Sequence, residues 1–274
     1  MRHARRLVPA LAVAVALAWC TGPVLWQLVT ALKSTEELYR VPPGWLPASP
    51  TLEHFARVFD GHPFGRNLLN SAVVAGASAL AALAFGSLAA YGLAILKIPG
   101  TRLVLGAALG AAMFPPIALV GPLFTLFDRL GLLNTYLALI IPHAALALPL
   151  TLWVLTSYFG EIPRDILKAA EVDGCTPLAA LWHILLPVAA PGLATAGILA
   201  FIYSWNEFLF ALSLAGTGRV QTVTVAIALF PGLEEFPWGQ IAAASLIVTL
   251  PVIGVVLILQ RRIVAGLTAG ALGG

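Results

Sequence analysis

Four residues within one apolar segment carry side chains that could bind a ligand. The stretch "FIYSWNEFLF", residues 201–210, places Tyr203, Trp205, Asn206 and Glu207 among Phe, Ile and Leu. Carboxylate, amide and phenol groups exchange hydrogen bonds with hydroxyl groups, and an aromatic ring can cover an apolar ligand face. The alternative is a structural hydrogen bond to a neighbouring helix, or a place near the end of the segment. The residues alone leave both interpretations open.

A second polar stretch, "KAAEVDGCTPLAALWHILLP" at residues 168–187, lies between two long apolar runs. Pro163 suits the first turn of a helix, and Ala169-Ala170 favours helix while presenting little bulk. Gly174 is a natural left-handed terminator. The sequence therefore predicts a helix over residues 163–173.

The same stretch contains the start of a second helix. Thr176 followed by Pro177 is typical of an N-cap with proline in the first helical turn. Pro187 and Pro191 are expected to end this helix and lead into the next apolar run. The two helices together predict an amphipathic hairpin, with a solvated loop as the alternative.

Other chemistry has no support in the sequence. The patterns GxxxxGK[ST], HExxH and GxSxG are absent. The two cysteines, Cys20 and Cys175, lie in separate segments and form neither a CxxC pair nor a disulfide framework. We therefore expect no catalytic residue, no metal site and no cofactor on this chain, which is not an enzyme.

The composition requires a bilayer as the solvent. The chain has 274 residues, of which 60% are hydrophobic and only 10% charged, and its mean hydropathy is +0.95. About a quarter of the residues of a soluble domain are charged, and about 20 apolar residues cross a membrane as a helix. The fold class is thus all-α and polytopic, a single membrane domain over residues 1–274. The six expected spans cover residues 7–32, 68–94, 102–127, 133–158, 189–215 and 239–260.

Two of these spans have special features. Arg2, Arg5 and Arg6 before the first apolar run resemble a signal peptide, but the run is too long for one, so we expect a retained first span. Pro115-Pro116 removes two backbone donors from the third span and predicts a kink or break. That kink could be a simple bend or a hinge beside a transport pathway.

The basic residues indicate which side faces the cell interior. If the N-terminus is inside, nine of the fifteen Lys and Arg residues are inside: Arg2, Arg5, Arg6, Lys97, Arg102, Arg164, Lys168, Arg261 and Arg262. Four of the other six lie in one long outer loop, residues 33–67, and long loops weigh less in this rule. Both termini and the loop at residues 159–187 are therefore expected in the cytoplasm.

The spacing in that loop resembles the signature of binding-protein-dependent ABC importer permeases. The family pattern is Glu-Ala-Ala, three residues, Gly, nine residues, Ile, one residue and Leu-Pro. Here Ala169-Ala170, Gly174, Ile184 and Leu186-Pro187 match with every gap kept, and Lys168 replaces the glutamate. The stretches "FIYSWNEFLFALSLA" and "QRRIVAGLTAGALGG" are similar to the carbohydrate branch, specifically the maltose- and trehalose-type second permease, and most of all to trehalose-import permeases.

The resemblance implies a bacterial plasma-membrane importer. The loop at 159–187 would be the coupling helix that docks into a cytoplasmic ATPase. The coupling residues are then Lys168, Ala169, Ala170, Glu171, Asp173, Gly174 and Pro177. The implied partners are a second permease, two ATP-binding subunits that hold ATP and Mg²⁺, an external sugar-binding protein and the lipid bilayer, with no nucleic acid.

The resemblance implies one further expectation for the pathway, and the spacing of the residues gives another for the first hairpin helix. The chain would form half of the pathway for a sugar such as trehalose or maltose, lined by Tyr203, Trp205, Asn206 and Glu207. On the first hairpin helix Lys168 can pair with Asp165 or Glu171, and Glu171 could supply the negative charge that Lys168 lacks. The alternatives are an ABC permease for another solute, or a secondary carrier. Carriers usually show several ionisable groups within their spans, and here only Glu207 is convincing.

Overall fold

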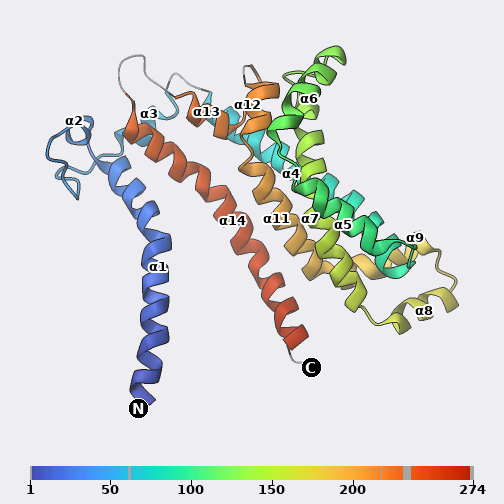
Figure 1. The fold of residues 1–274 in the computed structure, drawn as a ribbon. Coiled ribbons are helices and arrows are strands. Elements are labelled where there is room, and N and C mark those ends of the chain that lie inside the picture. The colour runs from blue at the N-terminus through green and yellow to red at the C-terminus, as the bar shows by residue number, and fades with distance from the viewer. Residues whose placement is uncertain (1, 61–62, 217, 231–235, 272–274) are drawn as a thin grey trace. The chain divides into compact units, whose positions relative to one another are not determined.

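The computed structural model describes residues 2–60, 63–216, 218–230 and 236–271, whose regular secondary structure is helical, with no strand among them (Figure 1). The all-α prediction is confirmed. The elements are α1 (Arg2–Leu32), α2 (Thr35–Leu38), α3 (Glu53–Arg57), α4 (Phe64–Ala90), the π-helical turn η1 (Tyr91–Ile95), α5 (Thr101–Ala112), α6 (Ile117–Arg129), α7 (Tyr136–Glu161), α8 (Arg164–Val172), α9 (Pro177–Ala180), the π-helical turn η2 (Leu181–Leu185), α10 (Leu186–Val188), α11 (Ala190–Trp205), α12 (Leu209–Ala215), α13 (Val223–Ala228) and α14 (Trp238–Ala271).

Several of these helices are long and apolar enough to cross a membrane. Four qualify singly among the described residues: Pro9–Leu32, Phe64–Ile95, Tyr136–Glu161 and Trp238–Leu259. Two further pairs qualify if each bent pair counts as one span, which gives up to six. One pair is α5 with α6, bent by 90°, and the other is Pro177–Val188 with α11, bent by 83°. Six is also the number expected from the sequence.

The bend in the third predicted span lies at the proline pair. Helix α5 ends at Ala112 and α6 begins at Ile117, so Pro115-Pro116 falls in the gap. Proline has no N–H to donate and cannot continue a helix from the preceding turn. The predicted kink or break is confirmed as a break, and the 90° bend shows that no single straight helix covers residues 102–127.

The helix expected over residues 189–215 is instead two helices. Helix α11 ends at Trp205 and α12 begins at Leu209. The Glu207 carboxylate causes the interruption, because its two oxygens accept the N–H groups of Phe210 at 3.0 Å and Ala211 at 3.1 Å. These are N–H groups of the first turn of α12, which have no partner within their own helix.

The chain forms two compact units, and the first contains Met1–Arg66 with Ala226–Pro251. Here the buried His54 of α3 bonds through Nε2 to the Lys33 carbonyl at 2.9 Å. The Lys33 ammonium bonds to the Gly44 carbonyl and lies 5.3 Å from the centre of the Trp26 ring. These contacts fold the segment after α1 around Lys33, so that the expected outer loop has internal structure.

The second unit contains Asn67–Val225 with Val252–Gly274, and α7 lies at its centre. Figure 1 shows α6 and α12 at one end of this unit and α8 and α9 at the other. Small residues let its helices approach closely. A Cβ atom at Gly86 of α4 would lie 2.8 Å from the Thr151 methyl group of α7. At Gly192 of α11 it would lie 2.5 Å from a ring carbon of Tyr158.

Gly192→Ala is therefore expected to destabilise the protein. The new methyl group would also lie 2.9 Å from the Tyr158 Cβ, which a change of rotamer does not move. Overpacking of this kind costs about 1–3 kcal/mol, more than the gain in helix propensity of about 1 kcal/mol. Thermal unfolding of the purified complex should show a lower midpoint. Gly254→Ala is the control, because a Cβ there meets nothing within 4 Å; equal midpoints for both variants would contradict the prediction.

Candidate functional site

The predicted hairpin is present and its first helix ends as expected. Helix α8 runs from Arg164 to Val172, and Gly174 follows with φ of +77°. The Cys175 N–H bonds to the Ala170 carbonyl at 2.9 Å, and the Gly174 N–H bonds to the Glu171 carbonyl at 3.0 Å. Such bonds to the last turn close a helix through a left-handed residue, which is why glycine stands there.

The second helix begins as predicted and ends later than predicted. The Thr176 hydroxyl accepts the Ala179 N–H at 3.3 Å, with Pro177 as the first helical residue. Pro187 does not end the helix, because the chain stays helical to Val188. The preceding turn η2 is π-helical, with the Leu186 N–H bonded to the Leu181 carbonyl, and this wider turn leaves room for the proline ring. The sharp bend follows at Ala189.

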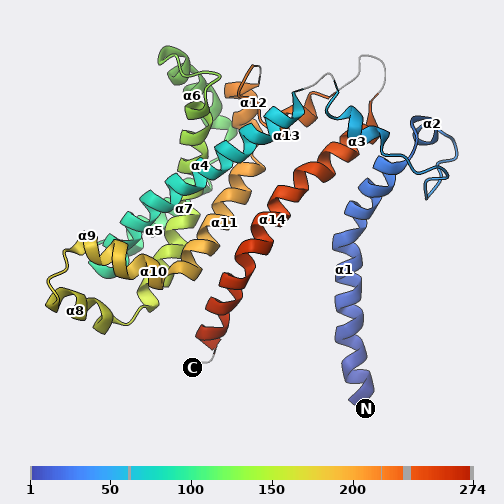
Figure 2. The ribbon, with the colours of Figure 1, turned by 180° about the vertical axis from the view of Figure 1, so that it is seen from behind.

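An apolar face anchors the hairpin to the ends of α4 and α7. Ala170 is 2% exposed, and Leu181 and Leu185 are also buried. Leu181 and Leu185 share one cluster with Tyr91 of η1 and Phe159 of α7. Figures 1 and 2 both show α9 beside the same end of α4 and α5. A force on the hairpin would therefore reach α4 and α7 through packed side chains.

The opposite face of α8 is polar. Lys168 pairs with Asp165 at 3.3 Å, with the two side chains 70% and 91% exposed, so this pair adds only a few tenths of a kcal/mol. The spacing also allowed a Lys168–Glu171 pair, which the described side chains do not form. Ala169, Asp173 and Pro177 are exposed, as are Gly174 and Glu171. Among the seven predicted coupling residues, only Ala170 is buried, and all seven lie in the hairpin.

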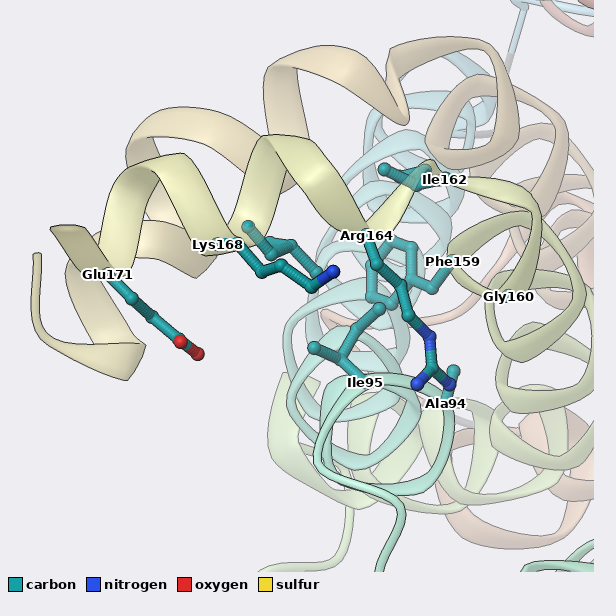
Figure 3. A pocket seen from close by; sticks show the side chains of 9 residues that line it. Ala94, Ile95, Phe159, Gly160, Ile162, Arg164, Lys168 and Glu171 are labelled. Carbon is teal, nitrogen blue, oxygen red and sulfur yellow. The ribbon is translucent and has the colours of Figure 1, made fainter.

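A cavity lies between α8 and the ends of η1 and α7 (Figure 3). Figure 3 shows the Arg164 side chain reaching toward Ala94, while the Glu171 carboxylate lies further along α8. The cavity is lined by Ala94, Ile95, Phe159, Gly160, Ile162, Arg164, Leu167, Lys168 and Glu171. It thus combines an apolar wall with charged groups of both signs.

The second predicted group of residues lies at the break between α11 and α12. Tyr203 is 39% exposed, and the exposed Asn206 donates its amide N–H to the Ile202 carbonyl at 2.8 Å. Trp205 is 3% exposed, and its indole N–H has no partner in the described part of the chain. The Glu207 carboxylate points to α7. The structure thus separates the four candidates into two exposed and two largely buried side chains.

His143 of α7 is the residue that the sequence did not reveal as part of this group. It is fully buried, and its Nε2 lies 3.0 Å from Glu207 Oε2 while its Nδ1 lies 2.9 Å from the Ser204 hydroxyl. The available signal was a single basic residue in a long apolar helix, since such residues usually have a partner inside the bundle. No group of three or more His, Cys, Asp or Glu side chains that could hold a metal occurs among the described residues.

The comparisons with known proteins agree with this architecture. The model of the family "Binding-protein-dependent transport system inner membrane component" matches residues 82–268. The chain is 46% identical over 255 residues to the "Trehalose transport system permease protein SugB" of Mycobacterium tuberculosis (strain CDC 1551 / Oshkosh), covering 92% of each chain.

Two further relatives and one structure extend the agreement. The chain is 42% identical to the "Sulfoquinovosyl glycerol transport system permease protein SmoH" of Agrobacterium fabrum, covering 92% of this chain and 88% of the relative. It is 41% identical to the "Trehalose/maltose transport system permease protein MalG" of Thermococcus litoralis, covering 93% and 92%. The fold matches a chain of a bacterial ABC transporter involved in the import of the acidic polysaccharide alginate, with a TM-score of 0.77, 21% identity and coverage of 94% and 96%. The chain belongs to the family of inner membrane components of binding-protein-dependent transport systems.

Proposed function

We propose that this chain is the permease subunit of an ATP-driven ABC importer and forms half of the passage for a sugar, a disaccharide such as trehalose or maltose. The observation that carries the proposal is identity of 41–46% over nine-tenths of the chain to permeases named for trehalose and for trehalose/maltose. The relative named for sulfoquinovosyl glycerol supports a sugar as the cargo. As a transport component, the chain is not itself an enzyme.

The proposed mechanism uses the hairpin as the coupling element. ATP and Mg²⁺ bind to two copies of a cytoplasmic subunit, and closure of that pair moves the hairpin. Because the hairpin packs on α4 and α7 through Leu181 and Leu185, its movement shifts the spans. Together with a second permease, the bundle then opens toward a loaded sugar-binding protein outside. This scheme requires the hairpin and both termini to lie in the cytoplasm.

The proposed passage runs past the break between α11 and α12. Tyr203 and Asn206 are the exposed polar side chains there, and they offer groups that hydrogen-bond to sugar hydroxyls. Glu207 and Trp205 belong to the same wall but are largely buried, so we assign them to its support.

Copurification and uptake test the proposed function. The complex purified from membranes should contain an ATP-binding subunit. Right-side-out or reconstituted vesicles that enclose ATP should take up labelled trehalose or maltose, and the same vesicles without ATP should not. Competition among unlabelled disaccharides then identifies the cargo. Uptake that persists without ATP and collapses with the ion gradient would instead establish a secondary carrier.

Glu171→Ala tests whether this residue replaces the missing motif glutamate. Glu171 is exposed one helical turn after Lys168, so the substitution should not affect folding. If its carboxylate contacts the ATPase, losing a charged hydrogen bond of about 1.5–3 kcal/mol should lower transport-coupled ATP hydrolysis at least tenfold. Asp165→Ala is the matched control on the same helix, 91% exposed. Wild-type ATP hydrolysis in the Glu171→Ala complex would refute the assignment.

A further inference from the structure

The chain segment at the end of α11 has two polar faces that point in different directions. Tyr203 and Asn206 are three residues apart, which places them on one helix face, and both are exposed. Ser204 and Glu207 are also three residues apart, and their side chains meet α7. The first face is open to a ligand, and the second is held by one side chain of α7.

That side chain is His143, which is 0% exposed and uses both ring nitrogens. An imidazole protonated on Nε2 donates to Glu207 Oε2 at 3.0 Å, and its Nδ1 accepts the Ser204 hydroxyl at 2.9 Å. This arrangement satisfies every polar group of the buried ring, as buried polar groups require. His143 thus fixes the backbone at residues 204 and 207, the two positions that bracket Asn206.

Glu207 extends the connection beyond α7. Its carboxylate accepts the Phe210 and Ala211 N–H groups that begin α12, and its carbonyl accepts the Thr224 hydroxyl at 3.0 Å. The position of Glu207 therefore determines where α11 stops and where α12 starts. Without the bond from His143, the carboxylate would still cap α12, but it would lose its hydrogen bond to α7.

We propose that His143 is a positioning residue for the transported sugar: it holds Ser204 and Glu207 against α7 and so sets the direction in which Tyr203 and Asn206 meet the cargo. The proposal rests on the proposed function, because it needs a sugar passage at this break. It assigns no contact with the sugar to His143 itself, since the ring is fully buried.

The test compares five single variants and one double variant in the reconstituted importer with its partner chains, using labelled trehalose and labelled maltose as probes. His143→Leu removes both hydrogen bonds with little change in volume, and His143→Gln keeps one donor and one acceptor. Thr151→Val is the matched control, because Thr151 is a buried polar residue of α7 whose hydroxyl bonds only within its own helix, to the Ala147 carbonyl at 2.9 Å. Asn206→Ala reports on the cargo contact directly.

The expected result separates positioning from a purely structural role. His143→Leu should keep ATP hydrolysis within about twofold of wild type while sugar imported per ATP falls about tenfold, as for loss of a charged hydrogen bond. The trehalose-to-maltose uptake ratio should change, His143→Gln should recover part of the loss, and Thr151→Val should behave as wild type. Adding Asn206→Ala to His143→Leu should cause little further loss, because both act on one contact.

Two results in the His143 variants would overturn the proposal, and the cargo-contact variants supply a third. One is an equal fall in ATP hydrolysis and uptake in His143→Leu, with sugar per ATP unchanged. The other is a full multiplication of the losses in the double variant. If His143→Leu does not assemble, the same two criteria apply to His143→Gln. If Asn206→Ala and Tyr203→Phe both leave sugar per ATP unchanged, the proposed passage fails, whereas loss only in Asn206→Ala leaves the passage intact and rejects the role of His143.

Discussion

Replacement of Glu207 by leucine is expected to leave little assembled permease in the membrane. The Glu207 carboxylate accepts bonds from His143, Phe210 and Ala211. Leucine leaves these three donors unpaired in a buried setting, at about 1–3 kcal/mol each. The sum is comparable to the whole stability of a typical domain, about 5–15 kcal/mol. The amount of permease in membranes and the unfolding midpoint in detergent measure the effect.

Two control variants show whether the hydrogen bonds are the cause. Glu207→Gln keeps an oxygen that accepts the α12 N–H groups and should assemble at a reduced midpoint. Asp165→Leu replaces an acid that is 91% exposed, so it should assemble like wild type. Wild-type abundance and midpoint for Glu207→Leu would show that the carboxylate does not hold α12 in place.

The features that the sequence predicts correctly are those decided within a few residues. The C-terminal end of α8 follows from the left-handed conformation of Gly174, and the start of α9 follows from the hydroxyl cap of Thr176. The break between α5 and α6 follows from Pro115-Pro116, which lacks backbone donors. Each of these signals acts on its own helical turn, so no tertiary contact is needed to recognise it.

The features that cannot be predicted from the sequence depend on which helices pack together. His143 and Glu207 are 64 residues apart, and only the packing of α7 on α11 brings them to hydrogen-bonding distance. The interruption at residues 206–208 follows from that contact and from the capping of α12. The sequence indicated that burying the Glu207 carboxylate in an apolar span costs free energy unless it faces protein or water. It did not indicate which residue would be its partner.

Pro187 illustrates a third case, in which a local rule is overridden. Proline after a helical stretch predicts a helix end, but the π-helical turn η2 absorbs the ring and the helix continues to Val188. The bend falls two residues after Pro187, at Ala189. Predicting the position of this bend requires knowing that Leu181 and Leu185 are buried in the core at the ends of α4 and α7.

Gly174→Val is expected to abolish ATP-driven uptake while the spans still assemble. Gly174 has φ of +77°, where a residue with a Cβ atom costs roughly 1–2 kcal/mol and a β-branched one more. The strain is relieved by opening the bonds that join Cys175 to Ala170 and Gly174 to Glu171. Opening them changes the angle between the two hairpin helices, and the surface offered to the ATPase is lost. Uptake of labelled sugar with ATP and recovery of the ATP-binding subunit with the purified permease measure the effect.

Gly131→Val is a matched control for this prediction, because Gly131 closes α6 in the same way. Its φ is +65°, its N–H bonds to the Asp128 carbonyl at 3.0 Å, and the Leu132 N–H bonds to the Phe127 carbonyl at 2.8 Å. A Cβ at either glycine meets nothing within 4 Å, so both variants introduce backbone strain alone. Because α6 and the hairpin lie at opposite ends of their unit, only Gly174→Val should release the ATPase (Figure 1). Gly174→Asn should retain uptake, because asparagine tolerates the left-handed conformation. Equal uptake by the two valine variants would contradict the prediction, since it would show that coupling to the ATPase does not depend on the geometry of the hairpin.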